Sequence, residues 1–126
     1  MNVLVVDDAK VMRNIVINAI KEHYKGELNI VEASDGIEAL EKMNAGNINL
    51  VCIDWNMPRL DGLEFVKKIR NINQFKLIPI LMITSEAARY MILDAVKAGV
   101  TDYIVKPIVG EKLWNKLKIH FQQGTK

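Results

Sequence analysis

Short apolar runs recur along the chain, and each one ends in residues that favour a turn or carry a charge. The runs are rich in valine, isoleucine and leucine, a composition typical of strands that are buried on both faces. They predict β-strands over residues 2–6, 28–33, 50–54, 80–84 and 103–105. The run at 28–33 is the most polar of these, so we expect it at an edge of the sheet.

Amphipathic segments lie between the predicted strands. Met12, Ile15, Val16 and Ala19 recur at i, i+3, i+4 and i+7, the spacing of one helix face, and Gly26 ends this segment. Four more helices are predicted, with these apolar or bounding positions: Ala39, Leu40 and Met43, ending near Gly46; Leu63, Val66 and Ile69; residues 86–98; and Leu113, Leu117 and Phe121, starting at Gly110.

Strands that alternate with helices in this way predict an α/β fold, a doubly wound parallel sheet with helices on both faces. We expect five strands and five helices in one domain over residues 1–126, without a linker, a repeat or a separate output domain. Such sheets bind ligands beyond the carboxyl ends of the strands, where the strand order reverses. Functional residues are therefore expected at that edge.

Composition excludes several classes of protein. The net charge of the 126 residues is +2, and the cationic side chains are spread along the chain without a basic stripe for nucleic acid. No signal peptide opens the sequence, and no run approaches the ~20 apolar residues of a membrane span. The single cysteine, Cys52, lies within an apolar run, which favours a buried side chain in a reducing compartment. We expect a cytoplasmic protein that binds neither membrane nor nucleic acid.

Polar residues gather where the predicted strands end. Asp7 and Asp8 follow the first strand, and Asp54 closes the third. Because these ends share one edge of a parallel sheet, the carboxylates should lie close together, where their repulsion raises a pKa unless a cation compensates it. A hard divalent ion such as Mg²⁺ suits oxygen ligands of this kind. With Thr84 after the fourth strand as a hydroxyl donor and Lys106 after the fifth as a cation, the set predicts a phosphoryl site with Asp54 as its nucleophile.

Each of these residues also has an ordinary structural interpretation. An aspartate at a strand end is commonly a turn residue, and Thr84 could cap the helix that follows it. Lys106 before Pro107 could simply mark the end of a strand. Their combination, in this order and at these strand ends, is what favours the phosphoryl site.

The sequence resembles the receiver domains of two-component response regulators over essentially its whole length. Within that family it is most similar to single-domain chemotaxis regulators of the CheY type. The resemblance is carried by Asp7-Asp8, Asp54-Trp55-Asn56-Met57-Pro58-Arg59-Leu60-Asp61-Gly62, Thr84-Ser85, and Tyr103 with Lys106-Pro107. It implies a flavodoxin-like fold whose sheet has the strand order 2-1-3-4-5.

The resemblance implies a role for each residue around the acceptor. Asp54 would receive phosphate from a histidine kinase and would bind Mg²⁺ directly, together with Asp8. Asp7 would bind the metal through water, and Asn56 would offer its backbone carbonyl. Lys106 would pair with the acceptor or its phosphate, and its bond to the following proline would be cis.

The resemblance also implies a conformational switch. Thr84 would move toward the phosphoryl oxygens, and Tyr103 would turn inward, a shift between two packings that the new charge favours. Tyr103 could also be a half-buried strand residue with its hydroxyl at the surface. Asn56 and Glu86 would tune hydrolysis of the aspartyl phosphate, or serve only as a turn residue and a helix acid favoured by the dipole.

A partner-binding face is expected beside this switch. Tyr90 and Ile92 stand among successive apolar residues of the fourth helix, and one helix face cannot bury all of them. Together with Tyr103, and with Trp114 and Lys116 of the last helix, they would form the output surface that the resemblance implies. Trp114 could instead be packed at the boundary of the core.

Three other side chains carry expectations. Trp55 follows the acceptor directly, and we expect it to flank the mouth of the site rather than pack in the loop. His23 and His120 fall on predicted helices away from the site, and both are expected to be solvated.

Together these interpretations predict a monomeric, phosphorylation-activated signalling switch that is not an enzyme for a separate substrate. Its partners would be a histidine kinase and a flagellar motor switch protein, with a phosphatase as a further candidate. Alternatives stay open: a phosphorelay intermediate, the receiver domain of a longer regulator, and a metal-dependent phosphohydrolase. No cap or substrate pocket for the last is evident in so short a chain.

Overall fold

A computed structural model describes residues 1–85 and 89–122, without the side chains of residues 89, 90 and 122. Five parallel strands form one sheet in the order β2-β1-β3-β4-β5. The strands are β1 (Asn2–Val6), β2 (Asn29–Ala33), β3 (Leu50–Asp54), β4 (Ile80–Thr84) and β5 (Asp102–Val105). The helices are α1 (Lys10–His23), α2 (Gly36–Ala45), α3 (Gly62–Arg70), the 3-10 turn η1 (Asn73–Phe75), α4 (Arg89–Ala98) and α5 (Gly110–Gln122).

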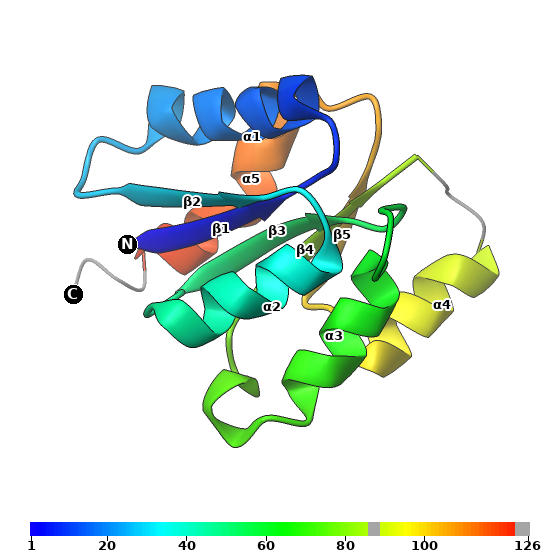
Figure 1. Ribbon diagram of the computed structural model, residues 1–126. Coiled ribbons are helices and arrows are strands. Elements are labelled where there is room, and N and C mark those ends of the chain that lie inside the picture. Colours follow the sequence, from blue (N-terminus) through cyan, green and yellow to red (C-terminus); the bar gives the residue numbers. More distant parts are fainter. Residues whose placement is uncertain (86–88, 123–126) are drawn as a thin grey trace.

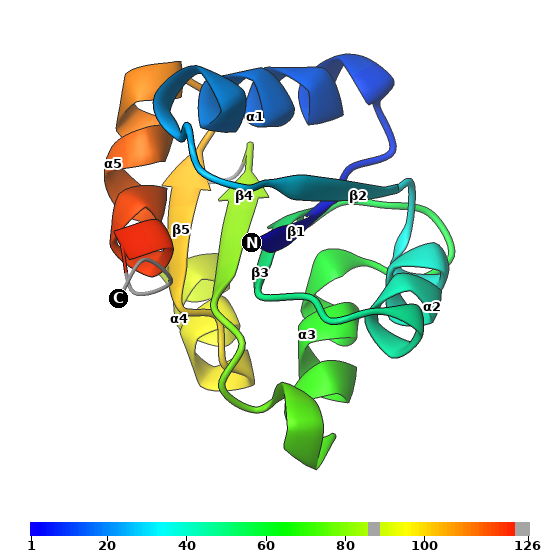
Figure 2. The same ribbon diagram turned by 90° about the vertical axis from the view of Figure 1, so that its left-hand side faces the viewer.

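The helices cover both faces of the sheet. Helices α1 and α5 lie on one face, and α2, α3 and α4 lie on the other (Figures 1 and 2). Two hydrophobic clusters fill these interfaces, one on each side of the sheet. All five residues of β3 are buried, because this central strand is covered on both faces. The predicted doubly wound fold and its strand order are therefore confirmed.

Most element boundaries agree with the pattern of the sequence. The strands at 2–6, 50–54 and 80–84 are confirmed residue for residue, and β2 is the polar edge strand that was expected. The predicted start of the fourth helix at Glu86 lies outside the described residues. The turn η1 was not predicted, and Phe75 anchors it by burying its ring in the core.

The buried face of α1 differs from the predicted one. Its buried residues are Val16, Ile17, Ala19 and Ile20, whereas Ile15 is 37% exposed. Val16 and Ala19 of the predicted stripe are therefore confirmed, Ile15 is wrong, and the buried face extends instead to Ile17 and Ile20. The physical reason is that α1 packs against both the sheet and α5, so its contact face is wider than the stripe that a single neighbour requires (Figure 2).

The lone cysteine is part of the core. Cys52 is buried in the cluster beneath α1 and α5, and burial raises the pKa of its thiol to about 12. The thiol is therefore neutral and packs as a small apolar group. Among the described residues, no helix has both the length and the apolar character needed to cross a bilayer.

Candidate functional site

Three carboxylates meet at the point where the strand order reverses. Val6 of β1 pairs with Ile53 of β3, so the residues that follow them reach the same edge of the sheet. There, carboxylate oxygens of Asp7, Asp8 and Asp54 all lie within 4.8 Å of one another. This is the edge at which doubly wound sheets bind ligands, and the predicted convergence of the three acids is confirmed.

Lys106 lies between two of these carboxylates. Its Nζ is 3.3 Å from Oδ2 of Asp7 and 3.4 Å from Oδ2 of Asp54. The backbone N–H of Lys106 also donates to the carbonyl of Thr84 at 2.7 Å, which ties the end of β5 to the end of β4. The bond between Lys106 and Pro107 is cis, as expected. The end of β5 therefore delivers a cation to the acids of β1 and β3.

Asp54 lies in an environment that is unfavourable for its negative charge. Its side chain is almost fully buried, and burial raises its pKa, with the charge of Asp7 adding to the shift. Lys106 and a hydrogen bond from the backbone of Trp55 act in the opposite direction without cancelling it. The pKa of Asp54 therefore stays above its ordinary value, which shows that its negative charge is incompletely compensated by the protein.

The donor set fits a hard divalent cation. Lys106 brings one positive charge against three carboxylates, so the described residues leave an excess of two negative charges when all are ionised. The ligand atoms are all oxygens, and Asp8 is exposed, which gives an ion access from solvent. This edge of the sheet is an acidic pocket suited to a divalent metal.

Backbone contacts fix Asp7 in place. Its N–H donates to the carbonyl of Ala33 at 3.1 Å, and its Oδ1 accepts from the N–H of Ala9 at 2.9 Å.

Arg13 of α1 donates from Nη1 to the carbonyl of Asp7 at 2.7 Å and pairs with Glu32 of β2 at 2.9 Å. Arg13 was missed from the sequence, where an arginine on a helix carries no signal that its guanidinium reaches back to a strand end.

An open hollow adjoins the acids. It has a volume of about 470 Å³ and is lined by Asp8, Asn56, Met57, Pro58 and Asp61. Asn56 is exposed at its rim, two residues beyond the acceptor. The loop from β3 to α3 thus borders space in which a phosphoryl donor can approach the carboxylates.

Trp55 does not flank this hollow. Its side chain is 9% exposed and belongs to the core cluster beneath α2, α3 and α4. The expectation that it lies at the mouth of the site is therefore wrong. An outward ring would leave the core unfilled, whereas an inward ring buries a large apolar surface.

Thr84 lies in the position that its strand predicts. It is buried at the end of β4, one residue beyond the pairing of Asp54 with Ile83, and it pairs with Val105 of β5. The structure thus brings the predicted phosphoryl residues to one edge: Asp7, Asp8, Asp54, Thr84 and Lys106. Glu86, predicted to tune hydrolysis, lies outside the described residues.

The expected partner face is only partly assembled. Tyr103 is half-buried against the core, and Nζ of Lys116 lies 5.4 Å from the centre of its ring. Ile92 is half-buried, and the side chain of Tyr90 is not described. Leu93 and Val96, which were not predicted, are 51% and 58% exposed on α4.

Trp114 does not join Tyr103. Its ring stacks on His23 of α1 at 5.5 Å and tilts against Phe121 at 5.1 Å. It therefore lies on the α1 side of α5, and its predicted place in the partner face is wrong. The alternative, packing at the core boundary, is confirmed.

The two histidines differ from each other. His23 is exposed, as expected. His120 is half-buried, and its Nδ1 is buried without a hydrogen-bond partner among the described residues. Burial lowers the pKa of His120, and Asp102 opposes the shift. The expectation of a solvated His120 is therefore wrong.

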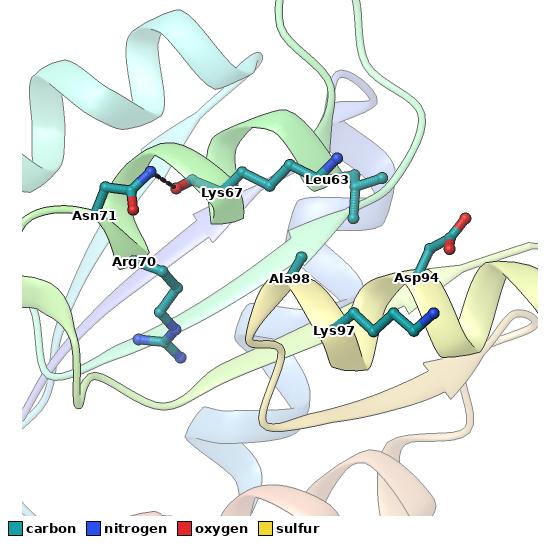
Figure 3. A pocket seen from close by; sticks show the side chains of 7 residues that line it. All are labelled: Leu63, Lys67, Arg70, Asn71, Asp94, Lys97 and Ala98. Atoms are coloured by element: carbon teal, nitrogen blue, oxygen red, sulfur yellow. Dashed lines mark hydrogen bonds between the residues drawn. The ribbon is translucent and has the colours of Figure 1, made fainter.

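A larger hollow of about 620 Å³ lies elsewhere, between α3 and α4 (Figure 3). Its lining consists of Leu63, Lys67, Arg70, Asn71, Asp94, Lys97 and Ala98, and includes none of the acids at the sheet edge. Arg70 has a structural role there, because its guanidinium donates to the carbonyls of Phe75, Lys76 and Gly99 at 2.9, 3.1 and 2.9 Å. Size alone therefore does not locate the functional site.

The fold and the acidic edge together define a receiver domain that presents a buried aspartate to a phosphoryl donor. The family described as "Response regulator receiver domain" matches residues 3–118, and the chain belongs to this family. Its relatives include chemotaxis regulators. It is 46% identical to chemotaxis protein CheY1 of Helicobacter pylori (strain J99), over 94% of this chain and 95% of that protein. It is 42% identical to chemotaxis protein CheY-3 of Vibrio cholerae, over 98% of this chain and 93% of that protein.

The solved structures agree with this assignment. The chemotaxis response regulator CheY4 of Vibrio cholerae superposes with a TM-score of 0.85 at 34% identity, over 94% of this chain and 97% of that one. A receiver domain from Francisella superposes with a TM-score of 0.81 at 28% identity and covers 98% of both chains. The chain is thus homologous to chemotaxis receiver domains over nearly its full length.

Proposed function

We propose that this chain is a phosphorylation-activated response regulator of chemotaxis, which accepts a phosphoryl group on Asp54 from a histidine kinase. The observation that carries the proposal is a buried carboxylate that lies beside two more carboxylates and 3.4 Å from Lys106. The relatives' names place them in chemotaxis.

The chemistry begins with the ionised form of Asp54. One of its carboxylate oxygens attacks the phosphorus of a phosphohistidine, the P–N bond breaks, and the imidazole nitrogen leaves with the electron pair and takes up a proton. The product is an aspartyl phosphate. Lys106 supports this transfer, because its ammonium group faces the negative charge that spreads over the phosphoryl oxygens.

Asp7, Asp8, Asp54 and the backbone carbonyl of Asn56 would hold Mg²⁺ at this site. Bound there, the ion would neutralise charge on the acids and on the phosphoryl oxygens. The oxygen-only donor set and the excess negative charge support this choice of cation. Asn56 and Glu86 would set the lifetime of the phosphate through their positions beside the acceptor and after Thr84.

The output would follow from two residues on neighbouring strands. The hydroxyl of Thr84 would donate to a phosphoryl oxygen and draw the end of β4 toward Asp54. Tyr103, which pairs with Met82 of β4, would then move further inward and away from Lys116. The surface of α4, β5 and α5 would change, and a flagellar motor switch protein would bind the phosphorylated form.

The remaining expectations complete the proposal. The protein would act as a cytoplasmic monomer, without membrane or nucleic-acid partners. Its chemistry would be confined to its own phosphorylation and dephosphorylation, so it would not be an enzyme for a separate substrate. A phosphatase could shorten the lifetime of the signal.

Pull-down with beryllofluoride, which mimics the bound phosphoryl group, tests the output. Immobilised protein is incubated with a motor switch protein and, separately, with a histidine phosphotransfer protein, with and without beryllofluoride. Capture of the motor switch protein only with beryllofluoride, and its loss in Asp54→Asn, is the expected result. Capture of the phosphotransfer protein alone would favour a phosphorelay intermediate instead.

A further inference from the structure

One ion pair fastens the loop between β3 and α3 to the start of α2. Arg59 in this loop places Nη2 2.7 Å and Nε 2.8 Å from Oδ2 of Asp35. The carboxylate of Asp35 is buried, while the guanidinium reaches it from the exposed side. The other oxygen, Oδ1, accepts from the N–H of Glu38 at 2.8 Å and caps α2. One carboxylate therefore serves both the helix start and the loop.

Main-chain contacts bring the loop against α2 at the same point. The N–H of Gly36 donates to the carbonyl of Leu60 at 3.0 Å, and a Cβ at Gly36 would collide with that oxygen. Arg59 has a φ of 67°, in the left-handed region that residues with a side chain rarely adopt. Such a conformation persists only where its surroundings hold it. The N–H of Leu60 donates to the carbonyl of Pro58 at 2.8 Å across Arg59, and the ion pair with Asp35 fixes the Arg59 side chain.

The opposite side of this loop borders the metal site. Asn56 lies in the loop and lines the hollow that also contains Asp8. The loop closes on itself where the N–H of Gly62 donates to the carbonyl of Trp55 at 2.8 Å. Arg59 and Asn56 therefore belong to one short segment that a main-chain hydrogen bond closes directly after the acceptor strand.

We propose that the ion pair between Arg59 and Asp35 positions the loop of residues 55–62 for metal binding beside Asp54. The proposal rests on the proposed function of Asp54 as the phosphoacceptor. Neither Arg59 nor Asp35 touches the reacting atoms, so both are positioning residues. They act through the placement of Asn56, whose carbonyl belongs to the proposed ligand set.

Two conservative substitutions remove the ion pair and preserve the local backbone. Asp35→Asn keeps a capping side chain, because asparagine caps helices about as well as aspartate does. Arg59→Asn keeps a residue that tolerates the left-handed region. Charge alone predicts opposite effects: loss of the carboxylate weakens cation binding nearby, and loss of the guanidinium strengthens it. Positioning predicts that both substitutions weaken binding.

Calorimetric titration with Mg²⁺ distinguishes these outcomes. We expect Asp35→Asn and Arg59→Asn each to weaken binding roughly three- to tenfold, between the small worth of an exposed ion pair and the larger loss when a direct partner of a metal ligand is removed. The double variant should bind no more weakly than either single variant, because one interaction is lost in all three. Arg59→Lys, which keeps a cation, should recover part of the affinity.

Asp102→Asn is the matched control. It makes the same change in an ion pair of similar length, 3.1 Å to Lys116, at the amino end of β5. Its Mg²⁺ affinity should equal that of the unaltered protein. Unchanged affinity in Asp35→Asn and Arg59→Asn, or shifts in opposite directions, would overturn the positioning role. Failure of the proposed function would look different, because the unaltered protein would then bind no Mg²⁺ or Asp54→Asn would bind it equally well.

Discussion

Replacement of Asp54 by asparagine should stabilise the fold in the absence of metal. The carboxylate oxygens of Asp7, Asp8 and Asp54 lie within 4.8 Å of one another, and at an effective dielectric constant of about 20 a repulsion at this distance costs about 3.5 kcal/mol. The attraction between Asp54 and Lys106, whose charged atoms are 3.4 Å apart, stabilises the ionised form by about 5 kcal/mol on the same scale. Asp8 is exposed, so its repulsion is screened to about 1 kcal/mol and the attraction to Lys106 nearly cancels the two repulsions. The cost of burying the charge then favours the neutral side chain by about 1–2 kcal/mol.

The pH dependence of this difference has a defined sign. Folding raises the pKa of Asp54, so the folded state favours its protonated form. The penalty is absent below the pKa of the unfolded chain and develops as the pH rises through the folded-state pKa. The advantage of Asp54→Asn should therefore be largest near neutral pH and should shrink as the solution is acidified.

Urea unfolding at neutral pH, with EDTA and then with Mg²⁺, measures the effect. We expect Asp54→Asn to have the larger free energy of unfolding in EDTA, and Mg²⁺ to stabilise the unaltered protein more than the variant. Asp102→Asn, which removes a carboxylate that pairs with Lys116 and lies away from the three acids, should bring no such gain. A variant less stable than the parent in EDTA would refute the view that Asp54 carries an uncompensated charge.

Three further outcomes are expected. Asp35→Ala should destabilise the protein by about 1 kcal/mol through loss of the α2 cap, as measured by urea unfolding. Hydrogen bonds from the backbone and from Arg59 lower the pKa of Asp35 in the folded state. The loss of stability should therefore be present above the unfolded-state pKa and should disappear as the pH falls through the folded-state pKa. Lys106→Ala should leave some phosphorylation by acetyl phosphate but abolish beryllofluoride-dependent capture of the motor switch protein, and unchanged capture would remove Lys106 from the switch. Arg70→Ala should lower the free energy of unfolding by about 1–3 kcal/mol because three carbonyls lose a donor; restoration by Arg70→Lys would contradict the need for a planar guanidinium.

The sequence predicts the fold and the acceptor edge for the same reason. Apolar runs covered on both faces fix the strands, and parallel strands carry their terminal residues to one edge, so Asp7, Asp54 and Lys106 converge without any knowledge of side-chain contacts. Turn-forming and charged residues determine where each strand ends, and the parallel topology brings these ends to one edge of the sheet.

The direction of individual side chains was harder to predict. Trp55 turns into the core and Trp114 turns toward α1, because each fills space that only the assembled layers define. The contact between Arg59 and Asp35 joins two segments that are distant in the sequence, so no local pattern predicts it. These features depend on tertiary packing, which overrides what spacing along one element can indicate.

Mass analysis after incubation with acetyl phosphate and Mg²⁺ tests the central claim most directly. The intact protein should gain the mass of one phosphoryl group, and borohydride reduction with peptide mapping should place it on Asp54. Asp54→Asn should gain none under the same conditions. A phosphoryl group on another residue, or one that persists undiminished in Asp54→Asn, would contradict the assignment of Asp54 as the acceptor.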